Sequence, residues 1–150
     1  MSKPMATTKP RVFVDADVLF AGSASSSEYG ASLVVLRMAE ITLIEAITSQ
    51  QVVTEVERNL RTKMPKALPA FQLLVSRCLQ VVADPKPSDV QSYVGLADEK
   101  DLPILVTAVQ QDCLWLVTFN IRHFQPGHPE VTVLQPGDFL QQVRHMLANL

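Results

Sequence analysis

Arg11-Val-Phe-Val-Asp15 is the stretch from which the fold class follows, because it is short, apolar after its first residue and closed by a carboxylate. Polar and apolar side chains do not alternate in it, so it fits a parallel strand buried on both faces better than a half-exposed strand. Parallel sheets bind their ligands beyond the carboxyl ends of the strands. We therefore expect Asp15 at the edge of the sheet where a functional site forms.

Strand-like and helix-like segments alternate through the rest of the chain. Apolar, often β-branched segments predict further strands at residues 41–47, 79–83, 114–118 and 131–134. Apolar residues at helical spacing predict helices at residues 25–38, 49–60, 65–79, 88–96 and 101–110, and from residue 138 onwards. This alternation predicts an α/β protein with a three-layer α/β/α fold and a central, mainly parallel sheet of about four to five strands.

Two segments have the spacing of a capping box, in which side chains satisfy the amides at the start of a helix. They are Ser25-Ser-Ser-Glu28 and Thr48-Ser-Gln-Gln51. The first predicts a helix start near residue 25. The second predicts that another helix begins near Ser49, directly after a strand.

The chain has the size of one domain. At 150 residues it can bury about two thirds of its unfolded surface without disulfides, so we expect residues 1–10 to form a disordered tail and residues 11–150 a single domain. Cys78 and Cys113 are far apart and lack metal-ligand spacing, which indicates buried thiols in a reducing cytoplasm. No apolar run reaches the ~18 residues of a membrane span, so no membrane partner is expected.

The overall charge does not favour binding of nucleic acid by the whole surface. The net charge is −2, so any such binding has to be local. Basic residues gather between Arg58 and Lys66 and again at Arg122. Arg58 and Arg122 are therefore candidates for binding a substrate phosphate, although a solvated helix face explains the first cluster equally well.

Three acids and two polar residues fall where a parallel sheet would form its site. Asp15 ends the first strand, Glu55 lies on the helix after the second strand, and Asp101 opens another helix, where a carboxylate is favoured by the helix dipole. Thr118 and Asn120 lie at the end of the strand at residues 114–118. They would converge on Asp15 if the two strands are neighbours.

Clustered carboxylates point to a metal ion. Two carboxylates about 4 Å apart repel by ~4 kcal/mol at an effective dielectric constant of 20. A hard divalent cation such as Mg²⁺ compensates this repulsion and prefers oxygen ligands. Such an ion can also polarise a phosphodiester and activate water.

Each of these residues also has a purely structural explanation. Asp15 could form a turn with its own backbone, Glu55 could pair with Arg58, and Asp101 could be an ordinary helix cap. Thr118 could equally be a buried strand hydroxyl. Trp115 is expected in the core, and His123 is expected to be packed or solvated rather than catalytic.

The motifs around these residues together resemble those of the PIN-domain nuclease family. Residues 12–20, with Asp15 and Asp17, resemble its first motif, and Glu55 falls where the family has its helix-borne acid. Residues 98–108, with Asp101 opening an apolar helix, resemble the third motif, and residues 116–124, with Thr118 and Asn120, resemble the fourth. Leu134-Gln-Pro-Gly-Asp-Phe-Leu140 is similar to the closing strand and helix. The resemblance extends from Arg11 to Leu140, and the order and spacing of the motifs make it specific.

The resemblance implies a PIN fold and an endoribonuclease that depends on Mg²⁺ or Mn²⁺ and cleaves RNA. Asp15, Glu55 and Asp101 would hold the cation, with Asp15 and Asp101 binding it directly and Glu55 aligning a metal-bound water for the attack. Thr118 and Asn120 would complete the catalytic group. Many members are toxins of VapBC-type toxin–antitoxin pairs, so an antitoxin partner and a homodimer are also expected.

Two residues depart from the family pattern. Asn120 stands where many members have Asp, and an amide ligates a cation more weakly and cannot serve as a base. We therefore expect Asn120 to position substrate or bind through water, with activity below the family norm. Asp17 stands where Asn is usual, and it either belongs to the local scaffold or supplies part of the charge that Asn120 lacks.

Two other classes of protein remain open. Asp15-Ala-Asp17 also resembles the first motif of haloacid dehalogenase-type phosphatases, but the segment before Asp98 is not the long apolar strand that those enzymes require. Alternatively, the chain is a PIN-fold module that has lost its chemistry through Asn120 and only binds RNA or a protein partner.

Overall fold

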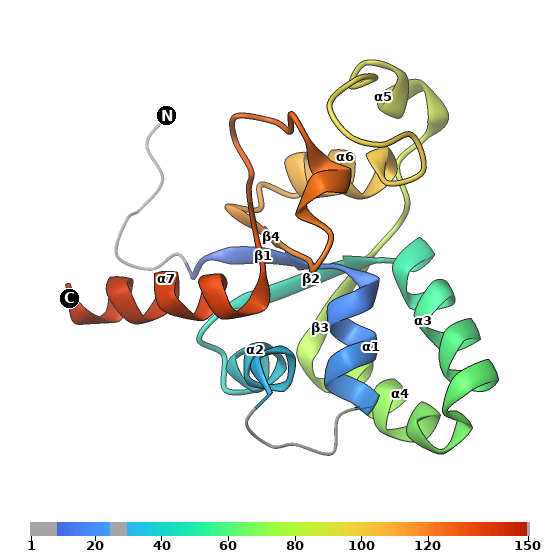
Figure 1. The fold of residues 1–150 in the computed structure, drawn as a ribbon, viewed down its shortest axis with the longest axis vertical. Helices are drawn as coiled ribbons and strands as arrows, with labels where there is room; N and C mark the ends of the chain where they lie inside the picture. The colour runs from blue at the N-terminus through green and yellow to red at the C-terminus, as the bar shows by residue number, and fades with distance from the viewer. Residues whose placement is uncertain (1–8, 25–29, 150) are drawn as a thin grey trace.

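The structure, a computed structural model, describes residues 9–24 and 30–149, and its centre is a five-stranded parallel sheet (Figure 1). The strands are β1 (Arg11–Val14), β2 (Glu45–Ser49), β3 (Leu79–Val82), β4 (Trp115–Val117) and β5 (Thr132–Leu134). Their order is β3-β2-β1-β4-β5, and every neighbouring pair is parallel. The predicted parallel sheet is thus confirmed. Strands β2 and β3 are added on one side of β1, and β4 and β5 are added on the other, so the strand order reverses between β1 and β4.

Helices cover both faces of the sheet. They are α1 (Ala16–Ala24), α2 (Ala31–Glu40), α3 (Gln50–Lys63), α4 (Leu68–Cys78), α5 (Pro87–Gln91), α6 (Leu102–Gln110) and α7 (Pro136–Ala148), with 3₁₀ turns η1 (Pro65–Ala67) and η2 (Ile121–Phe124). Figure 1 shows α6 on one side of the sheet and α2 and α7 on the other. Right-handed crossovers explain this, because the chain first winds from β1 to β3 and then returns past β1 to β4. The predicted three-layer fold is confirmed.

The central strands form the core. Val12, Phe13 and Val14 of β1 and Leu116 and Val117 of β4 are completely buried, which is why their sequences are continuously apolar. This packing fixes the positions of the residues that follow each strand.

The cysteines and the single tryptophan occupy the places expected of them. Cys78 and Cys113 are buried and not bonded to each other, and burial raises the pKa of the Cys113 thiol to about 12. Trp115 packs edge-to-face on Phe139 with ring centroids 5.4 Å apart. None of the helices in the described part of the chain is both long enough and apolar enough to span a membrane.

The structure departs from the prediction at one unpredicted helix and two predicted elements. Helix α1 was not predicted, because it starts directly after Asp15 and is buried on too much of its surface to show a clear apolar stripe. The strand predicted at residues 41–47 begins only at Glu45, since α2 runs to Glu40 and a turn with Thr42 at φ 63° follows. The helix predicted at residues 88–96 ends at Gln91.

The predicted capping boxes have different outcomes. Residues 25–28 lie outside the described residues, as do residues 1–8 of the expected tail. The prediction of a capping box at Thr48 is wrong. The Thr48 hydroxyl donates instead to the carbonyl oxygen of Val14 at 3.0 Å and links β2 to β1. Helix α3 does begin next to Ser49, but the N–H of Gln51 donates to the carboxylate of Asp84, at 2.8 Å.

Candidate functional site

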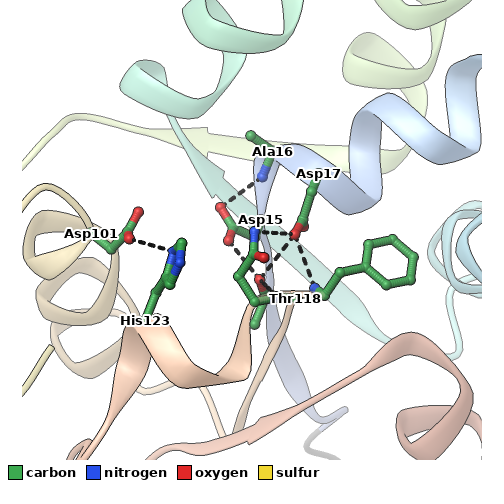
Figure 2. Close-up of polar contacts among 8 residues, drawn as sticks. Asp15, Ala16, Asp17, Asp101, Thr118 and His123 are labelled. Atoms are coloured by element: carbon green, nitrogen blue, oxygen red, sulfur yellow. Dashed lines mark hydrogen bonds and ion pairs between the residues drawn. The ribbon is translucent and has the colours of Figure 1, made fainter. Parts of the chain in front are cut away.

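Asp15 and Thr118 meet at the carboxyl ends of the two central strands (Figure 2). They follow Val14 and Val117, which are register partners in β1 and β4. The Thr118 hydroxyl donates to Asp15 Oδ2 at 2.8 Å, and the N–H of Ala16 donates to Oδ1 at 2.7 Å. Asp15 is only 7% exposed and Thr118 is completely buried. Because β1 and β4 are neighbours in the sheet, two residues that lie 103 positions apart in the sequence come into contact.

Asp17, in the first turn of α1, spans from this helix to the end of β4. Its Oδ2 accepts hydrogen bonds from the Phe119 N–H at 3.0 Å and from the Asn120 side-chain amide, also at 3.0 Å. Thr118 Oγ1 lies 3.3 Å from the same oxygen. Asp17 Oδ1 is buried, and no described residue offers it a hydrogen bond. One oxygen of Asp17 is therefore fully engaged, whereas the other has no partner.

Glu55 lies between Asp17 and Asp101 on the exposed side of α3. It lines one hollow together with Asp17 and Lys63 and a second hollow together with Asp101 and Lys100. Within the described residues, Glu55 forms no ion pair with Arg58. The surface-pair explanation of Glu55 therefore does not hold.

Asp101 faces a histidine rather than capping its own helix. It occupies the position before α6 but makes no side-chain capping bond. Its Oδ2 is 3.1 Å from Nδ1 of His123 in an ion-pair contact, without the alignment of a hydrogen bond. Figure 2 shows this pair to one side of Asp15, Asp17 and Thr118. The interpretation of Asp101 as a simple N-cap is wrong, and the contact with His123 was not foreseen.

Asp98 joins Asp101 and His123 in a compact group. Each of the three offers a ligand atom, and these atoms lie within 4.8 Å of one another. The Asp98 N–H donates to the carbonyl oxygen of His123 at 2.8 Å, which holds the two segments together. No other trio of acidic, histidine or cysteine side chains in the described ranges has this spacing. Asp15, Glu55 and Asp101 thus share one edge of the sheet but are more widely spaced.

The acids at this edge influence one another electrostatically. Burial raises the pKa of Asp15 to about 7, and repulsion from Asp17 and then Asp101 adds to it, against the hydrogen bonds from Thr118 and Ala16. Burial also raises the pKa of Asp17, with a further contribution from Glu55, against hydrogen bonds led by that from Phe119. These four carboxylates therefore form one electrostatic group.

This donor set fits a hard divalent cation. It consists of carboxylate oxygens, two of which, Asp17 Oδ1 and Asp101 Oδ2, are buried without a hydrogen bond from any described residue. Asp101 Oδ2 has only the ion-pair contact with His123, and Asp17 Oδ1 has no ion-pair partner among the described residues. A buried carboxylate oxygen without a hydrogen bond is costly, and a cation with oxygen ligands would remove that cost.

The basic residues near the acids are partly those expected. Arg122 lines a hollow next to the acids together with Phe119, Asn120, His123 and Gln135. Arg58 is exposed on α3, but the two hollows beside Glu55 are lined by Lys63 and Lys100 and not by Arg58. Lys63 belongs to the basic cluster predicted between Arg58 and Lys66, and it lies on the same helix as Glu55. Lys100 was missed, because nothing in its local sequence places it near Glu55.

Comparison with known proteins yields one family and several similar folds. The family model described as PIN domain matches residues 11–122. The structure of VapBC2 from Rickettsia felis, described as bound to a DNA fragment from their promoter, is similar with a TM-score of 0.60 and 13% identity over 82% of this chain and 96% of that chain. VapC20 from Mycobacterium tuberculosis, described as a sarcin-ricin loop cleaving toxin, is similar with a TM-score of 0.52 and 16% identity over 70% and 86%. No curated protein matches the sequence.

Proposed function

We propose that this chain, which belongs to the PIN-domain family, is a metal-dependent endoribonuclease that cleaves phosphodiester bonds in RNA. The observation that carries the proposal is the buried carboxylate of Asp15, which is crowded by other acids at the edge of the sheet where the strand order reverses. Membership of the PIN-domain family argues against the alternative of a haloacid dehalogenase-type phosphatase. That alternative also requires Asp17 to act as a proton donor, whereas its Oδ2 already accepts hydrogen bonds from Phe119 and Asn120.

Asp15, Glu55 and Asp101 are the residues that we propose to hold Mg²⁺ or Mn²⁺. Their wider spacing is compatible with this role, since Mg²⁺ keeps several waters and takes only one or two protein carboxylates directly. When bound, such a cation neutralises the acids, polarises the phosphodiester and activates the attacking water.

The chain's own residues have distinct roles in this proposal. Thr118 orients Asp15 through its hydroxyl. Glu55 is exposed and accepts no hydrogen bond from the described residues, so it is available to align water and accept its proton. Arg122, in the hollow next to Asn120, would hold an RNA phosphate. The Asn120 amide donates to Asp17, which fits a positioning role and not that of a base.

We further propose that the chain is the toxin of a toxin–antitoxin pair, works in the cytoplasm and forms a homodimer. The fold similarity to VapBC2 and VapC20 supports the toxin assignment. Binding of a purified candidate antitoxin that also blocks RNA cleavage would test it.

Cleavage of single-stranded RNA in the presence of Mn²⁺ tests the enzymatic proposal. Asp15→Asn and Glu55→Gln should each reduce the rate by at least about 100-fold, because each removes a charged group from the site. Glu57→Gln on the same helix, and wild-type protein in EDTA, are the controls; the first should keep activity and the second should lose it.

Two results would count against the proposal. Unreduced cleavage by Asp15→Asn or Glu55→Gln would remove that residue from the site. Wild-type protein that binds RNA without metal and does not cleave it at any Mn²⁺ concentration would instead be a binding module.

A further inference from the structure

Asp17 and Asn120 contact each other across the site, although they come from different elements. Asn120 Nδ2 donates to Asp17 Oδ2 at 3.0 Å, and the backbone N–H of Phe119 donates to the same oxygen. Three donors from the segment after β4 therefore approach one oxygen of Asp17, where the dashed lines converge in Figure 2. This arrangement fixes the orientation of the whole carboxylate.

The second oxygen of Asp17 lacks a partner. Oδ1 is buried and accepts no well-aligned hydrogen bond from the described part of the chain, although the backbone N–H of Val18 also interacts favourably with the Asp17 carboxylate. No lysine, arginine or histidine in that part lies within ion-pair distance of Asp17. The charged groups that act on it include Asp15 and Glu55, which both repel it. A carboxylate oxygen in this setting is expected to have a cation or an ordered water as its partner.

A purely structural role does not explain a carboxylate at this position. An asparagine at residue 17 would also present an oxygen to the Phe119 N–H and the Asn120 amide, without the cost of burying a charge beside Asp15. The negative charge is thus unfavourable for the metal-free fold, and a role in binding a cation accounts for it.

We propose that Asp17 is the fourth carboxylate of the site and presents Oδ1 to the divalent cation, while Asn120 is a positioning residue that holds Asp17 by its amide. The inference rests on the proposed function and deepens it. The two departures from the family motifs are then one feature, because the amide and the carboxylate face each other across a single hydrogen bond. The site keeps its fourth negative charge, on α1 instead of after β4.

Exchange of the two side chains tests this inference through metal affinity, without any RNA. The variants are Asp17→Asn, Asn120→Asp and the double variant Asp17→Asn/Asn120→Asp, each titrated with Mn²⁺ by calorimetry. Asp17→Asn should weaken Mn²⁺ binding by at least about 10-fold. The double variant should bind within about 3-fold of wild type, because it restores one carboxylate and one amide across the same contact.

Asp112→Asn is the matched control. Asp112 is exposed, lies before β4 at the opposite end of the sheet and has φ 55°, a conformation that Asn also adopts. This variant removes one negative charge, as Asp17→Asn does, but it removes the charge far from the site. The Mn²⁺ affinity of Asp112→Asn should therefore equal that of wild type. The melting temperature of Asp17→Asn in EDTA should equal or exceed that of wild type.

Several results would overturn the inference. They are a wild-type Mn²⁺ affinity in Asp17→Asn, a lower melting temperature of this variant in EDTA, and failure of the double variant to recover binding. Wild-type protein that binds Mn²⁺ and cleaves RNA would keep the proposed function even if the inference fails. Wild-type protein that binds no divalent cation would remove both.

Discussion

Asp15 is the residue whose environment differs most from what a carboxylate prefers. It is 7% exposed, and burial together with the nearby acids raises its pKa to about 7. Its two hydrogen bonds, from Thr118 and Ala16, only partly offset this cost. In the metal-free protein, Asp15 is therefore expected to be partly protonated at neutral pH.

The raised pKa of Asp15 predicts how stability depends on pH. The unfolded carboxyl titrates near 3.8 and the folded one near 7, so the folded state binds the proton more tightly. The contribution of Asp15 to stability is highest below about pH 4 and falls by on the order of 4 kcal/mol as the pH rises to about 7. In EDTA, Asp15→Asn should therefore be more stable than wild type, and more so at pH 8 than at pH 5. Urea denaturation at both pH values measures this, and a variant that is less stable at pH 8 would show that the charge is structural.

At the scale of elements, α3 depends on a distant loop for its start. Ser49 precedes the helix but makes no side-chain capping bond. The carboxylate of Asp84, in the segment after β3, accepts the N–H of Gln51 instead, at 2.8 Å. Helix α3, which carries Glu55, is thus linked by this hydrogen bond to the segment that follows β3. This link helps to hold Glu55 at the site.

Loss of this cap should destabilise the protein modestly. Asp84→Ala removes both the acceptor and a charge at the positive end of α3, so the free energy of unfolding should fall by about 1 kcal/mol. Asp84→Asn keeps an acceptor and should cost less. Urea denaturation of both variants measures the difference, and equal stability of Asp84→Ala and wild type would show that water replaces the cap.

At the scale of the whole molecule, negative charge is concentrated at one end of the sheet. Asp15, Asp17, Glu55 and Asp101 lie around the carboxyl ends of the strands, although the net charge of the chain is only −2. The sheet is all parallel, so every strand directs its following residue to this same end. Repulsion at this end is present in the folded state and largely absent from the unfolded chain.

A divalent cation should therefore stabilise the folded protein as a whole. Mn²⁺ at about 100 times its dissociation constant should raise the free energy of unfolding by about 2.7 kcal/mol, because it binds the folded state. The affinity should increase from pH 6 to pH 8, since binding competes with the proton on Asp15. Thermal denaturation with Mn²⁺ measures this, with NaCl of equal ionic strength as the control. If Mn²⁺ stabilised Asp15→Asn by as much as it stabilises wild type, Asp15 would not be a ligand of the cation.

The sequence alone was sufficient for the architecture and for part of the site. The apolar segments that became β1 and β4 were recognisable because strands buried on both faces exclude polar residues almost completely. The edge strands β3 and β5 are only partly buried and were recognisable by their β-branched residues. A parallel order would bring Asp15 and Thr118 together if their strands were neighbours, and the structure supplied that condition by pairing β1 with β4. Helix α1 and the start of β2 were missed, since a largely buried helix shows little periodicity and the turn at Thr42 has no local signal.

Only the tertiary structure decided which polar groups are partners. The contacts of Asp17 with Asn120, Asp101 with His123 and Asp84 with Gln51 each join segments that are remote along the chain. A local pattern records which face of an element is buried, because burial acts on each residue through its own neighbours. Partners across a site depend instead on strand register and on the path of the loops, which are set by the packing of the whole chain.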